Sequence, residues 1–350
     1  IIKMNKIYIL TDYKNIFGSK HNATPYRSGM DKDLLKKYFE IYDFEVIFLK
    51  YSDINFRKMN FKDQYVLYTS SEDIGGLYKN YIEDIIYGLH LQGVKLIPDY
   101  KYLKAHNNKV FMEILRDLII NDNLNFIHSN YFGTLEELIN NINKIELPVV
   151  IKSAAGATSR GVYFANNRNE LIRNAKKISR SKYIFDELWD LGRAIKHKGY
   201  IKESKYRNKF IVQNFIPGLE NDWKILIYGE KYYILYRGVR DNDFRASGSH
   251  KFIFKEDIPD GILDFAKLIF DILNVPNLSI DVAFDGNKFH LFEFQTIYYG
   301  TYTIEESSFY FMKVNDKWRI IKETSILEKI YVESIINFIN KINYESSFRL

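Results

Sequence analysis

The stretch 149-VVIKSAAGATSRGVYF-164 combines an apolar strand pattern with a loop of small residues. The first apolar run ends at Lys152, and a second begins at Val162. Gly156 and Gly161 have the spacing of a P-loop, but Val162-Tyr163 stands where that motif needs lysine and a hydroxyl residue, so a P-loop is excluded. A small-residue loop can still fold its backbone N–H groups over phosphates, while a strand-end lysine supplies a point charge. The alternative is a plain strand–turn–strand with a solvated lysine.

The patterns on both sides of this stretch predict an α/β chain that becomes antiparallel toward its end. The expected strands and hairpins are 5–10, 44–49, 64–70, 94–98, 211–216, 223–240 (turning at Gly229-Glu230) and 278–295. The expected helices are 31–43, 78–93, 107–119, 168–180, 260–273 and 325–342. Residues 181–210 are charged and turn-rich and show no clear period.

The composition excludes several classes of protein. The 350 residues suffice for two or three packed lobes. The 50 basic and 44 acidic residues give a charge of +6, which suits an anionic ligand but lacks the dense basic patch of a nucleic-acid binder. The absence of cysteine excludes disulfides and cysteine catalysis. No apolar run approaches the about 18 residues of a membrane span, and Asp12 interrupts the start too soon for a signal peptide. A cytoplasmic enzyme without nucleic-acid or membrane partners is expected.

Two carboxylates lie within apolar strands of the last hairpin, 278-LSIDVAFDGNKFHLFEFQ-295. Asp281 interrupts the first strand and Glu293 the second, and a buried carboxylate must be paired or bound to a cation. Gln295 shares a strand face with Glu293 because side chains alternate along a strand. The three oxygen-bearing side chains predict a site for Mg²⁺, with Mn²⁺ as a substitute. The alternative is a polar stripe on a half-exposed hairpin.

The register of this hairpin decides whether the carboxylates can share a cation. A two-residue turn at Gly286-Asn287 would pair Asp281 with Phe292 and send Glu293 to the opposite face. A three-residue loop, or a bulge elsewhere, would bring both carboxylates to one face. We expect one of the last two arrangements.

Two further segments carry candidate binding residues. In 213-QNFIPGLENDWKILI-227, a strand end that could present its backbone to a base is followed by Glu220, Asp222 and Lys224 at alternating positions. In 236-YRGVRDNDFRASGSHKF-252, three arginines lie among small residues, at 237, 240 and 245. Arginine suits bidentate binding of carboxylate or phosphate. Ordinary surface loops are the alternative for both segments.

The order of these features resembles the ATP-grasp superfamily, most of all its ribosomal S6 modification and D-alanine–D-alanine ligase branch. The resemblance covers about residues 95–300. It implies nucleotide binding by Lys109, Lys152, Ser153, Gly156, Ser159, Gly161, Gln213, Asn214, Phe215, Ile216, Glu220 and Lys224. It implies magnesium binding by Asp281, Glu293 and Gln295. Arg245, in Asp243-Phe244-Arg245, matches the arginine that meets the transferring phosphate, and Lys152 and Arg237 complete the expected catalytic set.

The resemblance also implies the fold and the domains. The fold would be α/β (α+β), with an N-terminal pre-grasp lobe and two α+β lobes that clasp the nucleotide. The expected domains are 1–105 (pre-grasp), 106–210 (central lobe with the glycine-containing loop) and 211–350 (C-terminal lobe with the metal hairpin and a helical tail). The sequence departs from the family at Gln295, where asparagine is usual, and at Gln213, where glutamate is common. Its segment 165–211 is longer than usual, and its tail extends past the family's core.

The activity that the resemblance implies is ATP-dependent ligation of a carboxylate and an amine. The γ-phosphate of ATP would go to the carboxylate, and the amine would attack the resulting acyl phosphate. Two alternatives stay open, a kinase that stops at phosphoryl transfer and a nucleotide-binding module without turnover. The partners would be a small-molecule or peptide carboxylate and an amine, and a homodimer is left open.

Overall fold

The computed structural model of the chain describes residues 5–119, 127–156, 161–219, 221–238 and 252–347. The chain divides into two compact units. One, the composite unit, is formed by Ile1–His106 together with Glu220–Leu350, and the other, the insert unit, is Asn107–Leu219. The division into three domains at residues 105 and 210 stays a prediction.

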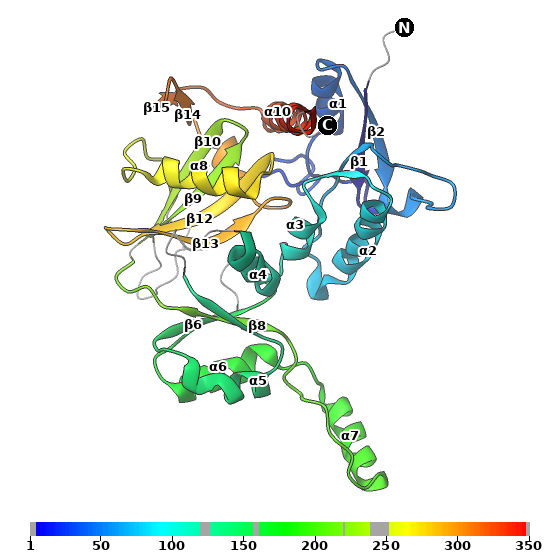
Figure 1. Cartoon of the computed structure of the whole chain (residues 1–350), viewed down its shortest axis with the longest axis vertical. Coiled ribbons are helices and arrows are strands. Elements are labelled where there is room, and N and C mark those ends of the chain that lie inside the picture. Colours follow the sequence, from blue (N-terminus) through cyan, green and yellow to red (C-terminus); the bar gives the residue numbers. More distant parts are fainter. Residues whose placement is uncertain (1–4, 120–126, 157–160, 220, 239–251, 348–350) are drawn as a thin grey trace. The chain divides into compact units, whose positions relative to one another are not determined.

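The amino-terminal part of the composite unit is a parallel α/β layer (Figure 1). Its sheet has the order β2-β1-β3-β4, formed by Asn5–Thr11 (β1), Phe44–Lys50 (β2), Tyr65–Leu67 (β3) and Lys95–Ile97 (β4). Its helices are Lys32–Glu40 (α1), Leu77–Leu91 (α2) and Tyr100–Ala105 (α3). Asp31 begins α1 by accepting two backbone hydrogen bonds, and Gly93, with a φ of 77°, follows the end of α2. The predicted βαβ pattern is confirmed.

The carboxyl-terminal part of the composite unit is a seven-stranded sheet with the order β13-β12-β9-β10-β14-β15, in which β11 pairs with β10. The strands are Asn221–Tyr228 (β9), Lys231–Gly238 (β10), Phe252–Ile253 (β11), Asn277–Phe284 (β12), Phe289–Gln295 (β13), Tyr310–Val314 (β14) and Lys317–Ile321 (β15). Helices Ile262–Leu273 (α8), Tyr302–Glu305 (α9) and Leu327–Ser347 (α10) complete it. Side chains of α8 contact Phe289 and Tyr232, so α8 covers one face of the sheet.

One hydrophobic core joins the two parts of the composite unit. Ile9 of β1, Leu226 of β9 and Ile335 of α10 are all buried in it. The fully buried Glu328, in the first turn of α10, accepts a hydrogen bond from the Lys20 ammonium at 2.7 Å. The two ends of the sequence therefore fold together, and the predicted tail helix is a core element.

The insert unit is a four-stranded antiparallel sheet, with the order β5-β8-β6-β7. Its strands are Ser129–Phe132 (β5), Val149–Ser153 (β6), Val162–Ala165 (β7) and Phe210–Asn214 (β8). Its helices are Lys109–Ile119 (α4), Leu135–Asn141 (α5), Arg168–Ser179 (α6) and Ile184–Lys196 (α7). Ile151, Leu171 and Phe210 lie in its core. The stretch 149–164 contains β6 and most of β7.

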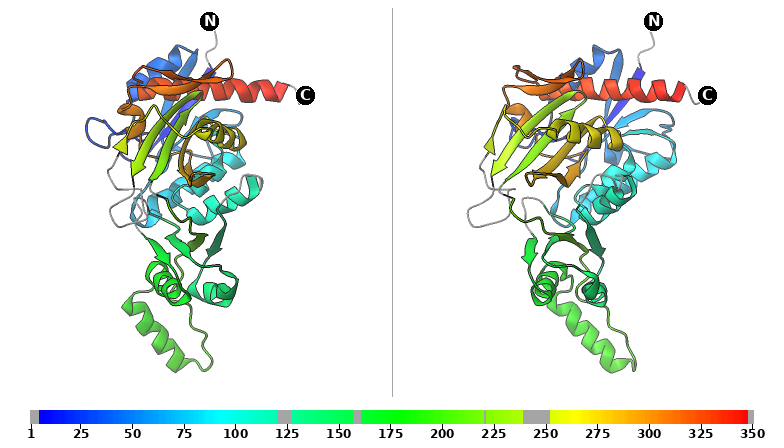
Figure 2. Two further views of the ribbon diagram at one scale, coloured as in Figure 1. Left: turned by 90° about the vertical axis from the view of Figure 1, so that its left-hand side faces the viewer. Right: turned by 60° about the vertical axis from the view of Figure 1, so that its left-hand side comes forward.

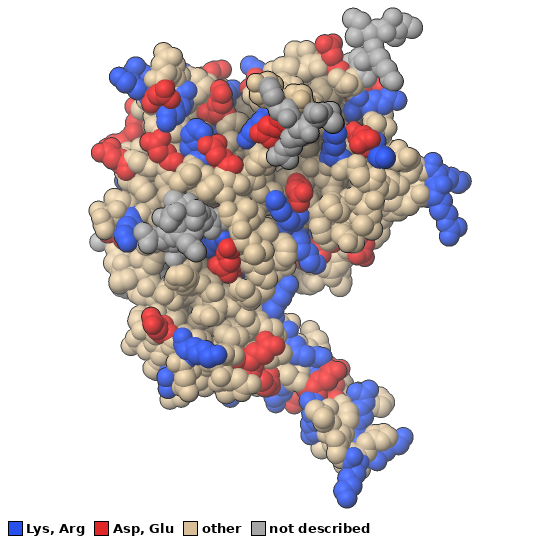
Figure 3. Space-filling view, viewed as in Figure 1, with Lys and Arg blue, Asp and Glu red and all other residues tan. Residues whose placement is uncertain are grey.

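Helix α7 stands away from α5, α6 and the sheet of its own unit (Figure 2). The expectation that residues 181–210 lack a period was wrong, because Ile184, Leu188, Leu191 and Ile195 have helical spacing that the intervening charges obscured. We call α7, together with the chain that leads to it and away from it, the arm. Basic side chains gather at the outer end of the arm (Figure 3). Among the helices of the described ranges, none is long and apolar enough to cross a membrane.

Candidate functional site

Lys152 lies next to the last residue of strand β6, near the strand end as predicted, and a glutamine of the neighbouring strand binds it. Its ammonium donates a hydrogen bond of 2.6 Å to Oε1 of Gln213 on β8. The amide nitrogen of the buried Gln213 donates in turn to Ser129 Oγ at 3.0 Å. A neutral amide orients the ammonium without cancelling its charge, so Lys152 remains suited to an anion.

The loop after Lys152 is tied to the start of helix α4. Lys109 donates from its ammonium to the carbonyl of Gly156 at 3.0 Å and from its backbone to the carbonyl of Ala154 at 2.8 Å. The Asn107 side chain accepts from the backbone of Gly156 at 2.8 Å. The two lysines expected at nucleotide phosphates, Lys109 and Lys152, therefore both belong to the insert unit and lie at the glycine-containing loop.

The far end of the loop needs glycine. Gly161 has a φ of 76°, and a Cβ atom there would lie 3.0 Å from Cβ of Ser153. Ser153 donates from its backbone to the carbonyl of Gly161 at 3.0 Å, which closes the base of the loop. Ser159, expected in the nucleotide site, lies outside the described residues.

The expected adenine hinge follows β8. Backbone N–H groups of Asn214 and Phe215 donate to the carbonyls of His128 and Pro148, at 3.1 and 3.3 Å. Because these groups are used within the insert unit, a base would have to be recognised by other atoms of the hinge, including those of Ile216. Glu220, the expected ribose-binding acid, lies outside the described residues.

A charged face forms on the side of the large sheet opposite α8. Strand pairing places Arg237 opposite Asp222, Lys224 opposite Asp281, and Asp281 opposite Glu293. Residues that pair directly lie on one face of a sheet, so these five side chains share a face across β10, β9, β12 and β13. We call them, with Ser279 and Gln295, the charged face. Lys224, expected at the nucleotide, lies on it in the composite unit and donates to Ser279 Oγ at 2.9 Å.

Arg237 is buried and held by two carboxylates. Its Nε and Nη2 atoms donate to the two oxygens of Asp222 at 2.6 and 2.7 Å, and Nη2 lies 2.8 Å from Oδ2 of Asp281. Burial alone would lower the pKa of Arg237, but Asp281 and Asp222 outweigh it and raise the pKa. Burial raises the pKa of Asp222 to about 6, against the opposing effect of Arg237. The guanidinium therefore stays charged.

Asp281 carries an oxygen that is poorly satisfied inside the protein. Its Oδ1 atom is buried and accepts no hydrogen bond from the described residues, and the Lys224 ammonium lies 3.6 Å from it. Burial would raise the pKa of Asp281, but Arg237 and Lys224 outweigh it and hold the pKa below its usual value. An ionised carboxylate with one unsatisfied oxygen is suited to an additional cation.

A β-bulge brings Glu293 to the face of Asp281. The turn is the two-residue Gly286-Asn287 turn, in which the backbone N–H of Asp285 donates to the carbonyl of Lys288 at 3.2 Å and Phe284 lies opposite Phe289. That register holds as far as Val282, opposite Leu291, and one extra residue on β13 then places Glu293 opposite Asp281. The prediction that a bulge could restore the shared face is confirmed.

The donor set of the charged face fits a hard cation. Asp281, Glu293 and Gln295 present two carboxylates and an amide, and the Gln295 amide nitrogen donates to Glu293 at 3.2 Å, which aligns the two side chains. Within the described ranges, no three His, Asp or Glu side chains group closely enough to hold a metal. A magnesium ion here would therefore need the Gln295 oxygen, water or phosphate to complete its shell.

Asp222, Ser129 and Asn107 hold site residues in place through contacts that the sequence did not predict. Counting outward from the Gly229-Glu230 turn pairs Asp222 with Arg237, so Asp222 could have been found from the hairpin alone. Ser129 contacts Gln213, and Asn107 contacts Gly156. In both pairs the two residues are far apart in the sequence, so no local pattern predicts the contact. Arg245, expected in the catalytic set, lies outside the described residues.

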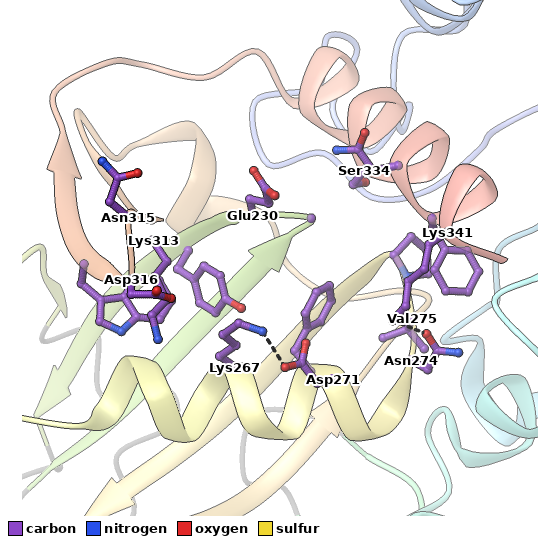
Figure 4. A pocket seen from close by; sticks show the side chains of 17 residues that line it. Glu230, Lys267, Asp271, Asn274, Val275, Lys313, Asn315, Asp316, Ser334 and Lys341 are labelled. Atoms are coloured by element: carbon purple, nitrogen blue, oxygen red, sulfur yellow. Dashed lines mark hydrogen bonds and ion pairs between the residues drawn. The ribbon is translucent and has the colours of Figure 1, made fainter. Parts of the chain in front are cut away.

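A separate cavity of about 750 Å³ lies in the composite unit beside α8, α10 and the turn after β9 (Figure 4). Its lysines are engaged at its walls: Lys267 with Asp271 at 2.5 Å, Lys313 with Asp264 at 3.2 Å, and Lys341 with Asn274 at 2.9 Å. The cavity contains none of the charged face, and we assign no chemistry to it.

Comparison with known proteins identifies the fold. No protein-family model matches the sequence, and no curated protein matches it. D-cycloserine synthetase DcsG is similar over 95% of this chain and 98% of its own, with a TM-score of 0.54 and 9% identity. The ADP complex of purK, N5-carboxyaminoimidazole ribonucleotide synthetase, is similar over 88% and 74%, with a TM-score of 0.51 and 12% identity. The ATP complex of D-alanine–D-alanine ligase from Bacillus anthracis is similar over 98% and 99%, with a TM-score of 0.50 and 12% identity. Together with the order of its motifs, these similarities show that the chain has the ATP-grasp fold.

Proposed function

We propose that the protein is an ATP- and Mg²⁺-dependent ligase that joins a carboxylate to an amine through an acyl phosphate. The observation that carries the proposal is the pairing of Asp281 with Glu293 on the charged face, beside the buried Arg237. The fold supports it, since similar structures include a D-cycloserine synthetase and a D-alanine–D-alanine ligase with ATP. Because those proteins are only 9% and 12% identical to this chain, they support its fold alone. The proposed ligase activity rests on the side chains of this chain.

In the insert unit, Lys109 and Lys152 would bind the phosphates of ATP. Both ammonium groups have neutral oxygen partners among their contacts, Gly156 O and Gln213 Oε1, so they can exchange these for phosphate oxygens with a gain in charge attraction. The loop from Ser153 to Gly161 would add backbone N–H groups. A closed loop would also keep water from the acyl phosphate.

In the composite unit, Asp281, Glu293 and Gln295 would hold Mg²⁺, which would neutralise phosphate charge when bound. Arg237 would act as a positioning residue, because it fixes one oxygen of Asp281 at 2.8 Å and favours the ionised form. Asp222 would act one step further away, by fixing Arg237 through two hydrogen bonds.

In the reaction, an oxygen of the substrate carboxylate attacks the γ-phosphorus of ATP, and the bond to the bridging oxygen breaks to release ADP. The nitrogen lone pair of the amine then attacks the acyl carbon. Phosphate leaves with the electron pair of the C–O bond, and the nitrogen loses a proton. The protein supplies position and charge, and needs no nucleophilic side chain. Arg245 remains predicted to face the charge that develops during transfer.

The test is a screen of carboxylates crossed with amines for release of ADP and phosphate. We expect both products to require an acid, an amine and Mg²⁺ together, and hydroxylamine to trap the acyl phosphate as a hydroxamate. Glu293→Gln should abolish the Mg²⁺-dependent turnover, whereas Asp271→Asn, which also removes one carboxylate but lies on α8 and off the charged face, should not. A stable phosphorylated acid that accumulates one-for-one with ADP, without a hydroxylamine effect, would replace the ligase by a kinase.

A further inference from the structure

Helix α7 carries an apolar face that the described part of the chain leaves exposed. Ile184, Phe185, Leu188, Trp189, Leu191 and Ile195 are each between 50% and 80% exposed. At 100° per residue they lie, with Gly192, along one side of the helix. Contiguous apolar surface that includes tryptophan and phenylalanine marks an interaction site. This surface is separate from the residues of the proposed ligase chemistry.

The polar side of α7, by contrast, is covered by the arm itself. Asp190 is the buried residue of this helix, and its carboxylate binds the ammonium of Lys182 and the hydroxyl of Tyr200, the latter at 2.9 Å. Lys182 also donates to the carbonyl of Glu203 at 3.0 Å. The chain on both sides of α7 is therefore attached to its polar side. A surface helix normally turns its apolar side inward, so this arm is built to present that side to a partner.

We propose that the partner is a second copy of this chain, whose α7 packs antiparallel against the first around a two-fold axis at the level of Asp190. This register places Leu188 level with Gly192, Phe185 with Ile195, and Trp189 with Leu191 of the other copy. Phe185, Leu188, Trp189, Leu191 and Ile195 then each meet an apolar position or Gly192, and Ile184 at the margin lies level with Lys196. An isologous contact requires such self-complementarity.

Gly192 supports a close helix–helix contact. It lies on the apolar side of α7, and apart from its chain neighbours and the helix's own backbone, no atom of the described residues lies within 4 Å of a Cβ atom built there. Glycine inside a helix is unfavourable relative to alanine, and nothing within the arm requires it. A helix that approaches at this position can place a leucine side chain in the open space, because the separation of packed helices follows the size of the contacting residues.

The charges of α7 favour the antiparallel direction. Its first turn carries Asp186 and Glu187, and its last turn carries Arg193 and Lys196. Antiparallel packing puts the acidic end of one helix level with the basic end of the other and opposes the two helix dipoles. Parallel packing would bring together the two basic last turns, each with Arg193 and Lys196.

The size of the surface indicates a reversible dimer. Thirteen residues make a helix about 20 Å long, and one helix pair buries less than the about 800 Å² per partner of a standard stable interface. Sedimentation velocity of the full chain over a concentration series should therefore show monomer and dimer in exchange. Leu188→Lys should raise the dimer dissociation constant at least about tenfold, as expected for a central interface residue. The matched control Ile139→Lys, on the exposed side of α5 in the same unit, should leave it unchanged.

Gly192→Ala separates dimer contact from helix stability. Alanine favours the helix but fills the space that would receive Leu188, so far-UV circular dichroism should show equal or greater helicity while the dimer weakens. A dimer that is unchanged or tighter with Gly192→Ala would contradict the proposed close approach.

The absence of cysteine from the chain allows the direction to be tested by cross-linking with a short bis-maleimide. In the antiparallel register, two copies of Leu191→Cys lie about 3 Å apart along the axis and two copies of Ile195→Cys about 15 Å apart. Leu191→Cys should cross-link to itself and Ile195→Cys should not, whereas a mixture of Phe185→Cys and Ile195→Cys should cross-link. A monomer at every concentration would overturn the proposal, and so would self-linking of Ile195→Cys. Binding of the monomer to phosphatidylserine vesicles, lost in Leu188→Lys, would replace the second copy by an anionic lipid surface.

Discussion

Replacing Arg237 by methionine should destabilise the composite unit because it leaves two carboxylates without their shared cation. Arg237 and Asp222 are 6% and 5% exposed, so water cannot take the place of the guanidinium. Three contacts of 2.6, 2.7 and 2.8 Å are lost together. Removing one partner of a buried ion pair costs about 3–5 kcal/mol, and we expect Arg237→Met to lower the free energy of unfolding by that amount.

The second variant, Asp222→Asn, tests whether the loss comes from the unpaired charge. In the double variant Asp222→Asn/Arg237→Met, both charges of this pair are gone, and part of the loss should be recovered. The double variant should be more stable than the sum of the single effects predicts, by about 1–3 kcal/mol. Lys267→Met serves as the control, because its pair with Asp271 lies at the surface and contributes no more than about 1 kcal/mol.

The assay is urea unfolding followed by tryptophan fluorescence. The chain has three tryptophans, and in a Trp189→Phe background the remaining two, Trp223 and Trp318, both lie in the composite unit. The signal then reports the unit that contains Arg237. If the four free energies of unfolding add within about 0.5 kcal/mol, the two side chains do not act together and the reasoning is refuted.

Three further outcomes are expected. Lys152→Ala should weaken binding of a non-hydrolysable ATP analogue by about 1.5–3 kcal/mol in calorimetric titration, with a smaller change in unfolding, and unchanged affinity in a folded variant would remove the assignment. Gly161→Ala should lower the stability of the insert unit by about 1 kcal/mol or more, because of the φ of 76° and the 3.0 Å approach to Ser153; a melting temperature equal to that of the wild type would contradict this. The hydrogen bond with His290 lowers the pKa of Asp285 from 3.8 to about 2, so its contribution to stability is complete above pH 3.8 and is lost as the pH falls toward 2. Asp285→Asn should flatten the stability profile in that window, and an unchanged slope would show that the pair does not form.

The sequence by itself determined most elements and one half of the charged face. Alternation of apolar residues predicted β9, β10, β12 and β13, because a half-buried strand repeats every two residues. The Gly229-Glu230 turn fixes the pairing of Arg237 with Asp222 by counting, since a tight hairpin couples register to the turn. The two asparagines at 107 and 108 predict a cap at the start of α4, where Asn108 accepts from the backbone of Phe111, and this signal and the position of Lys152 near a strand end are equally local features.

Only the tertiary structure decided how the two carboxylates meet. Counting residues from the Gly286-Asn287 turn places Glu293 on the face opposite Asp281. The bulge in β13 brings Glu293 back to the face of Asp281, and it forms against β12, whose other edge is already paired with β9. The pairing of β9 with β12, which brings Lys224 to Asp281, joins segments far apart in the sequence and has no local signal. Residues 1–106 and 220–350 share one core, and this also depends on contacts between segments far apart in the sequence. Local patterns fix which residues alternate, whereas long-range burial fixes which strands become neighbours, and the charged face needs both.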